Sequence, residues 1–136
     1  MQQAVMMKSR PQDEYRKQGV MTASPVELVV MLYDALKKNL VLGQRKIGKR
    51  DVQGAHDHLI KAQDIVNELV SCLDMSFPIS EELLNLYEFI LRSVGEANIR
   101  KNAEPLEVVI EIVDNLREAW KEVSMSSRGS MELGDD

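Results

Sequence analysis

The sequence predicts an all-α protein that folds as an antiparallel, up-and-down four-helix bundle. Four long segments place apolar residues three and four positions apart, which is the spacing of one helix face. No segment alternates between apolar and polar residues as a half-buried strand does. The connections between the segments are short, and short connections between long helices favour antiparallel neighbours.

The first helix is predicted over residues 24–47. Ser24 can cap its N-terminus, Pro25 suits the first turn, and Glu27 stands three residues after the serine. Together they form a capping box with proline at the first helical position. Gly48 follows as a stop signal, because glycine is common just after the last helical residue.

The same helix is apolar on nearly every side. Between residues 26 and 36 only Glu27 and Asp34 are polar, apart from one tyrosine. A helix that buries a single face needs only one apolar stripe, so this helix is expected to use more than one face. Its inner face is predicted to consist of Leu28, Leu32, Ala35, Leu36 and Leu42.

The second helix is predicted over residues 52–74, with Asp51 as its N-terminal cap. The third is predicted over residues 79–101, after Pro78. A fourth helix is predicted to follow Asn102, which caps its N-terminus. Each carries one apolar seam of the kind that packs helices at a shallow angle. The predicted seams are Ala55, Leu59, Ala62, Val66, Leu69 and Leu73, then Ile79, Leu83, Leu86, Ile90, Val94 and Ala97, then Leu106, Val109, Val113, Leu116, Trp120 and Val123.

The chain divides into three parts on this reading. Residues 1–20 are polar and contain methionine, and are predicted to form a flexible N-terminal arm. Residues 21–125 form the bundle, and residues 126–136 are predicted to be a disordered tail. The 136 residues are enough for about one domain.

Charge is unevenly distributed along the chain. The net charge of −5 argues against nucleic acid as the main partner. Residues 21–50 hold six basic residues against two acidic ones, and residues 102–125 hold six acidic residues against two basic ones. We expect helices of opposite charge to lie side by side.

The sequence is typical of a cytoplasmic protein. A single cysteine, Cys72, excludes an internal disulfide and fits a reducing compartment. The longest apolar run, from Leu28 to Tyr33, is six residues, whereas a membrane span needs about 20. No direct membrane insertion is therefore expected.

The residues of a catalytic or metal site are not recognisable. His56 and His58 are two positions apart, so on a helix they point in different directions and cannot hold one metal ion together. Cys72 has no second cysteine or fixed histidine partner, and a buried or groove-lining residue is the better interpretation. No glycine-rich phosphate loop is present. We expect a protein that is not an enzyme and that binds no cofactor and no metal.

Each helix carries apolar residues beyond its seam. Wide apolar faces and isolated exposed apolar residues are common in ordinary bundles. The alternative is that grooves between the helices remain apolar and accept an amphipathic segment of a partner. The residues that helical phase assigns to such grooves are Val30, Val41, Ile65, Cys72, Phe89, Ile99, Val108 and Ile112.

The chain resembles the family of flagellar export chaperones called FliS. The resemblance covers the chain from Tyr15 to Val123 in one order and with plausible spacing. Two departures are Ala35, where members commonly have glycine, and Asn102, where an aspartate is frequent. The matching segments are Tyr15, TASPVELVVMLYDAL at 22–36, KAQDIVNEL at 61–69, LYEFI at 86–90, EANIRKN at 96–102 and REAW at 117–120.

The resemblance implies a function in the bacterial cytosol. Members of the family hold the C-terminal segment of flagellin, which is disordered when free, and thereby prevent premature filament assembly. The complex then docks on FlhA, a component of the membrane export gate. No nucleotide or metal takes part. A disordered segment that folds on binding needs a large apolar surface to offset its ordering cost, which agrees with the surplus apolar residues.

The N-terminal arm has two expected roles within the resemblance. Val20 and Met21 are expected to cover part of a groove in the free protein and to be displaced by flagellin. Tyr15 is expected either to contribute to docking on the export gate or to pin the arm to the bundle. The family often has an apolar residue three positions before this tyrosine, and here that residue is Gln12.

One alternative function follows from the same surplus of apolar residues. The chain could be a structural bundle that self-associates, with its grooves filled by a second copy. Such a protein would form a stable homodimer, whereas the chaperone hypothesis expects a monomer or weak dimer when free.

Overall fold

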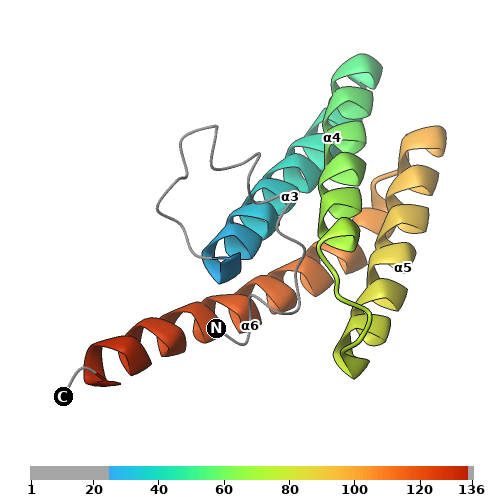
Figure 1. The fold of residues 1–136 in the computed structure, drawn as a ribbon. Coiled ribbons are helices and arrows are strands. Elements are labelled where there is room, and N and C mark those ends of the chain that lie inside the picture. Colours follow the sequence, from blue (N-terminus) through green and yellow to red (C-terminus); the bar gives the residue numbers. More distant parts are fainter. Residues whose placement is uncertain (1–24, 135–136) are drawn as a thin grey trace.

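The computed structural model describes the backbone of residues 25–134 and the side chains of residues 25–126. Over this range the chain forms four helices and no strand, so the all-α prediction is confirmed. The helices are α3 (Pro25–Gly48), α4 (Val52–Ser71), α5 (Pro78–Arg100) and α6 (Glu104–Gly134), shown in Figure 1.

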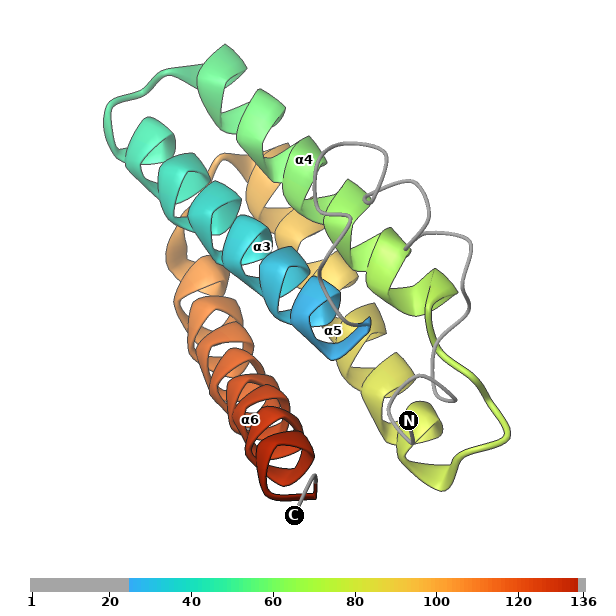
Figure 2. The same cartoon turned by 60° about the vertical axis from the view of Figure 1, so that its left-hand side comes forward.

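The four helices form the predicted up-and-down bundle. Each helix packs against the next one in the sequence, and α6 closes the bundle by packing against α3. Figure 2 shows the ends of successive helices joined by short connections. Helix α6 is the longest, and its C-terminal part extends beyond the other helices (Figure 1).

Local hydrogen bonds fix the ends of the helices. Asp51 Oδ1 accepts from the Gly54 amide at 2.9 Å, which confirms the predicted cap of α4. That bond also lowers the pKa of the Asp51 carboxyl below its ordinary value. Asn102 Oδ1 accepts from the Glu104 amide at 3.1 Å and so caps α6. Ser24, predicted to cap α3, lies outside the described residues.

The second helix ends earlier than predicted. Helix α4 stops at Ser71, and the turn that follows is held by Asp74. The Asp74 carboxylate accepts from the Ser76 hydroxyl at 2.6 Å, and the Asp74 carbonyl accepts from the Ser80 hydroxyl at 2.6 Å. Cys72 and Leu73, which precede this turn, are both buried.

The C-terminal segment differs from its prediction. Residues 126–136 were expected to be disordered, but α6 continues to Gly134. No proline interrupts the sequence after Pro105. Once a helix is nucleated, each further residue adds a hydrogen bond. Serine and single glycines have lower helix propensity but do not end the helix, and methionine is a good helix former.

The core follows the predicted seams with two departures. In α3, Leu28, Leu32 and Leu36 are buried as predicted, whereas Ala35 and Leu42 are only half-buried and Val29, Tyr33 and Leu40 are buried in addition. All six seam residues of the second helix are buried. In α5, Ile79 is 46% exposed and Leu86 only half-buried, whereas Tyr87 is buried at 2% exposure. The buried face there is rotated by one residue toward Ser80 and Tyr87. In α6, Leu106, Val109 and Val113 are fully buried, while Leu116 and Trp120 pack against the core at partial burial.

Candidate partner-binding surface

Helix α3 buries two of its sides and leaves a third one partly open. Tyr33, Leu36 and Leu40 have no exposed surface, and Val26, Leu28, Val29 and Leu32 are also buried. This wide buried face follows from the position of α3, which packs against both α4 and α6. The apolar character of α3 is therefore largely explained by two helix neighbours.

The remaining side of α3 forms a groove with α6. A hollow of about 290 Å³ lies beside the first turns of α3. Its apolar side chains are exposed or half-buried, and two of them are methionines, which adapt easily to different partners. The hollow is lined by Glu27, Val30, Met31, Lys121, Ser124 and Met125.

A second hollow of about 450 Å³ lies further along the same helix pair. Four of its side chains are basic and one is acidic, and two apolar residues lie among them. The surface here therefore combines two apolar side chains with an excess of positive charge. The hollow is lined by Asp34, Lys37, Lys38, Val41, Leu42, Arg45 and Arg117.

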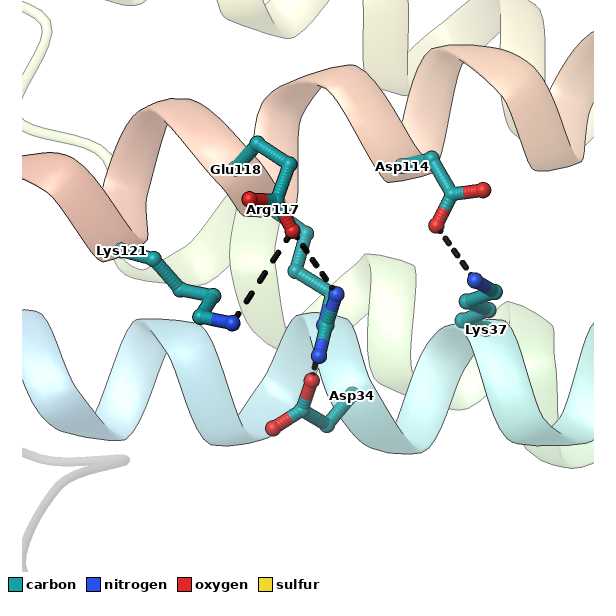
Figure 3. A network of polar contacts seen from close by, with 6 residues as sticks. All are labelled: Asp34, Lys37, Asp114, Arg117, Glu118 and Lys121. Atoms are coloured by element: carbon teal, nitrogen blue, oxygen red, sulfur yellow. Dashed lines mark hydrogen bonds and ion pairs between the residues drawn. The ribbon is translucent and has the colours of Figure 1, made fainter.

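Ion pairs join α3 to α6 along this groove (Figure 3). Lys37 Nζ lies 2.7 Å from Asp114 Oδ1, and Arg117 donates from Nε to the Asp34 carboxylate. Arg117 also contacts Glu118 at 3.0 Å. The bond with Asp34 raises the pKa of the Arg117 guanidinium above its ordinary value. The prediction that helices of opposite charge lie side by side is confirmed for α3 and α6.

Three of the residues predicted from helical phase to bind a partner are well exposed. Phe89 and Ile99 lie on α5 with 37% and 86% of their surface exposed, and Val108 lies on α6 with 53% exposed. Exposed large apolar side chains cost free energy in water unless something covers them. These three positions are therefore available for a partner.

Two other predicted residues are half-buried and one is inaccessible. Ile65 and Ile112 pack against the core, so only part of each side chain can meet a partner. Cys72 is 3% exposed, and its assignment to a groove is wrong for this structure. Cys72 keeps a helical conformation and donates its amide to the Glu68 carbonyl at 3.1 Å, so helical phase carries it to the buried side, three residues after Leu69. Val20, Met21 and Tyr15 lie outside the described residues.

Val30 and Val41, which helical phase assigned to grooves, each line one of the two hollows, but the sequence did not assign their neighbours to a groove. Met31, Leu42 and Met125 line the same groove. Met31 and Leu42 follow the two predicted residues directly, at positions that the same helical spacing would have reached. Met125 could not be found in this way, because its proximity to α3 depends on how the two helices pack.

The described residues carry no recognisable catalytic or metal chemistry. Within residues 25–126, no group of three or more histidine, cysteine or acidic side chains could hold a metal ion. His58 Nδ1 lies 3.0 Å from Asn39 Oδ1, and His56 Nδ1 lies 3.1 Å from Asn98 Nδ2. Both histidines thus tie neighbouring helices together. No described helix is long and apolar enough to span a membrane.

Comparison with known proteins assigns the fold and the family. The chain matches the family "Flagellar protein FliS" over residues 7–127. A solved structure described as a flagellar chaperone from bacteria superimposes with a TM-score of 0.71, covering 86% of this chain and 97% of the other. Its sequence identity is 14%, so this likeness supports the fold alone.

Curated relatives carry the same family name. The flagellar secretion chaperone FliS of Bacillus subtilis (strain 168) is 33% identical over 118 residues, which cover 87% of this chain and 89% of the relative. The FliS of Salmonella typhimurium is 35% identical over 109 residues, covering 78% and 81%. This family is a chaperone family without enzymatic activity, so the prediction that the protein is not an enzyme is confirmed. The chain belongs to the FliS family of flagellar proteins.

Proposed function

We propose that this protein is a cytoplasmic export chaperone that binds the disordered C-terminal segment of flagellin, prevents its premature polymerisation and delivers it to the export gate. The observation that carries this proposal is the match over most of the chain to proteins named flagellar secretion chaperones. The apolar side chains left exposed on a well-packed bundle support it, because a chaperone of this kind needs apolar surface outside its own core.

The binding step is coupled folding of the flagellin segment. A disordered segment loses conformational entropy when it becomes helical, so it must bury a large apolar area to bind tightly. The α3–α6 groove offers Val30 and Val41, and α5 and α6 offer Ile99 and Val108. These sites lie on different helices, which suits a long segment that wraps around the bundle.

Substitution of the two most exposed of the predicted binding residues tests this assignment. The variant Ile99→Ser/Val108→Ser removes two side chains that bury surface only when flagellin is bound. Burial of one such side chain is worth about 1.5–3 kcal/mol, so the dissociation constant for the flagellin segment should rise at least tenfold (about 1.4 kcal/mol). Met75→Ser, a comparable change of an exposed residue between α4 and α5, serves as control. An affinity unchanged in the double variant would exclude this pair from the binding surface.

The N-terminal arm is proposed to cover part of the groove and to be displaced by flagellin. Val20 and Met21 would be the covering side chains. Limited proteolysis of the free protein and of the complex tests this point, with faster cleavage of the arm expected in the complex. Equal cleavage in both states would contradict displacement.

Delivery is proposed to occur through FlhA, with Tyr15 at the contact. The variant Tyr15→Ala should weaken binding of the chaperone–flagellin complex to FlhA while leaving the affinity for flagellin unchanged. The conservative variant Tyr15→Phe separates the hydroxyl from the ring. Loss of flagellin affinity in Tyr15→Ala would instead assign this residue to pinning the arm.

A further inference from the structure

A buried asparagine ties the last turn of α5 to the first turns of α4. Asn98 is 7% exposed, so both polar groups of its side-chain amide need partners inside the protein. Its oxygen accepts from Lys101 Nζ at 2.7 Å, and its nitrogen lies 3.1 Å from His56 Nδ1. These three side chains form a polar triad that links α4, α5 and the residue that ends α5.

The direction of the hydrogen bonds in the polar triad is fixed by Lys101. An ammonium group can only donate, so the Asn98 oxygen must face it. The Asn98 nitrogen then donates toward α4, and His56 Nδ1 must accept. Rotation of the Asn98 amide by half a turn gives no alternative, because it would place two donors against each other at Lys101.

A proton on His56 Nδ1 breaks the polar triad. A protonated imidazole carries a hydrogen on both nitrogens and has no acceptor left, so Asn98 and His56 would then meet donor to donor. Histidine is the side chain that ordinarily gains a proton between about pH 8 and pH 5. His56 is exposed, so solvent can deliver the proton. Among the described residues, Asn98 is its one hydrogen-bonding partner and no acidic side chain forms an ion pair with it.

The charged groups at this end of the bundle do not replace the lost contact. Lys101 carries the same charge as a protonated His56 and disfavours it further. None of the other groups is hydrogen-bonded or ion-paired to His56. They are Lys46, Lys49 and Arg50 at the end of α3, Asp51 and Asp57 at the start of α4, Glu96 and Arg100 at the end of α5, and Glu104 and Glu107 at the start of α6.

His58 provides an internal contrast on the same helix. Asn39 donates from its nitrogen to the Ala35 carbonyl at 2.9 Å, so its oxygen faces His58 Nδ1 at 3.0 Å. His58 therefore donates in this contact, and a protonated imidazole can donate in the same way. Acidification thus breaks the contact of His56 and preserves that of His58.

The polar triad holds the turn that presents Ile99. Lys101 ends α5 in a left-handed conformation with a φ of 51°, and the amides of Lys101 and Asn102 both donate to the Ala97 carbonyl. A residue other than glycine keeps this conformation only when contacts around it hold it there. The bonds from Lys101 Nζ to the Asn98 side chain and carbonyl supply such contacts. Ile99, which is 86% exposed, lies inside this turn.

We propose that the polar triad is a pH-sensitive latch on the last turn of α5. Neutral His56 holds Asn98 and keeps the turn closed, whereas protonated His56 releases Asn98 and loosens the turn that carries Ile99. A loosened turn must be ordered again when a partner binds, so the affinity for the flagellin segment falls on acidification. This consequence for binding rests on the proposed function, whereas the latch is a property of the free protein.

Amide hydrogen exchange of the free protein tests the latch. The readout is the protection factor of the Lys101 and Asn102 amides, which corrects for the effect of pH on exchange itself. Between pH 7.5 and pH 5.0 it should fall about fivefold, the equivalent of one hydrogen bond. The Cys72 amide, which donates to the Glu68 carbonyl at the other end of α4, should keep its protection.

Two matched variants separate the histidines. His56→Asn keeps an acceptor near the position of Nδ1 and takes up no proton, so the protection of the turn should be the same at both pH values. His58→Asn should behave like the parent chain. Constant protection in the parent, or an equal fall in the parent and in His56→Asn, would overturn the proposal.

Titration with the flagellin segment at the same two pH values tests the consequence for binding. The dissociation constant of the parent should rise about fivefold more on acidification than that of His56→Asn. Equal pH dependence in the two proteins would contradict control of the binding surface by the latch. A lack of binding at pH 7.5 would contradict the proposed function instead, and the exchange measurements then decide on the latch by themselves.

Discussion

The hydroxyl oxygens of Tyr33 and Tyr87 lie 2.5 Å apart in the buried core and hydrogen-bond to each other. Tyr33 belongs to α3 and Tyr87 to α5, so the pair links the two helices across the bundle. Trp120 of α6 lies close enough to Tyr33 to influence its pKa, and Cys72, just after the end of α4, lies close enough to influence the pKa of Tyr87. The tyrosine pair is thus a polar point inside an apolar core.

Removal of one hydroxyl of the pair should destabilise the bundle. Tyr33→Phe leaves the Tyr87 hydroxyl buried without its partner, at a cost of about 1–3 kcal/mol in the free energy of unfolding. Tyr33→Phe/Tyr87→Phe removes both groups, so its cost should be clearly less than the sum of the two single variants. Urea unfolding measures all three. Strictly additive single effects would show that the hydroxyls do not interact.

Alkaline pH should weaken the fold through the same pair. Burial raises the pKa of Tyr87 to about 12 and raises the pKa of Tyr33 well above its ordinary value. The unfolded chain loses these protons near pH 10, where the folded protein keeps them. The contribution of the two tyrosines to the free energy of unfolding is therefore fully present below about pH 10 and is lost as the pH rises toward 12. Tyr87 alone contributes about 2–3 kcal/mol to this loss.

Unfolding titrations between pH 9 and pH 12 check this dependence, with Tyr33→Phe/Tyr87→Phe as the control. The double variant should show a flatter decline over the same interval. An identical decline in both proteins would assign the alkaline sensitivity to other groups.

Close packing of α3 on α4 makes Gly43 sensitive to substitution. A Cβ atom at this position would lie 2.6 Å from Leu59 Cδ2, and Leu59 is fully buried. Gly43→Ala should therefore destabilise the protein by about 1–3 kcal/mol through overpacking. At Gly48 a Cβ would meet nothing within 4 Å, so Gly48→Ala should be neutral or slightly stabilising. Thermal unfolding of the two variants checks the contrast, and equal effects would contradict it.

The two histidines of α4 should carry their protons on different nitrogens. Asn98 Oδ1 accepts from Lys101 Nζ at 2.7 Å, so the Asn98 amide nitrogen faces His56 Nδ1, which must accept. Asn39 donates to the Ala35 carbonyl at 2.9 Å, so its oxygen faces His58 Nδ1, which must donate. Nitrogen chemical shifts of neutral His56 and His58 should report Nε2–H and Nδ1–H respectively. The same tautomer at both positions would contradict these hydrogen bonds.

The fold was predictable because its periodic signals are strong. In α4 the predicted and buried seams coincide, because all six apolar residues of its regular 4-3-4-3-4 spacing lie on the buried face. In α5 the pattern allowed two phases, because Leu86 and Tyr87 are adjacent and both can face inward. In the structure Tyr87 faces inward, and its hydroxyl hydrogen-bonds to the hydroxyl of Tyr33.

The binding surface was less predictable because exposure depends on which helices meet. Cys72 was assigned to a groove beside the seam, but it follows Leu69 by three residues in a helical conformation and is buried. The α3–α6 groove combines residues more than eighty positions apart, such as Val30 and Met125. Helical phase gives the direction of a side chain on its own helix, and it carries no information on what lies across the groove.

The central claim is that this bundle binds the disordered C-terminal segment of flagellin. Calorimetric titration of the full chain with that segment, at several temperatures, tests it most directly. The account predicts tight one-to-one binding with a large negative heat-capacity change, because a disordered chain buries apolar surface as it folds. No binding at micromolar concentrations would contradict the chaperone function proposed here.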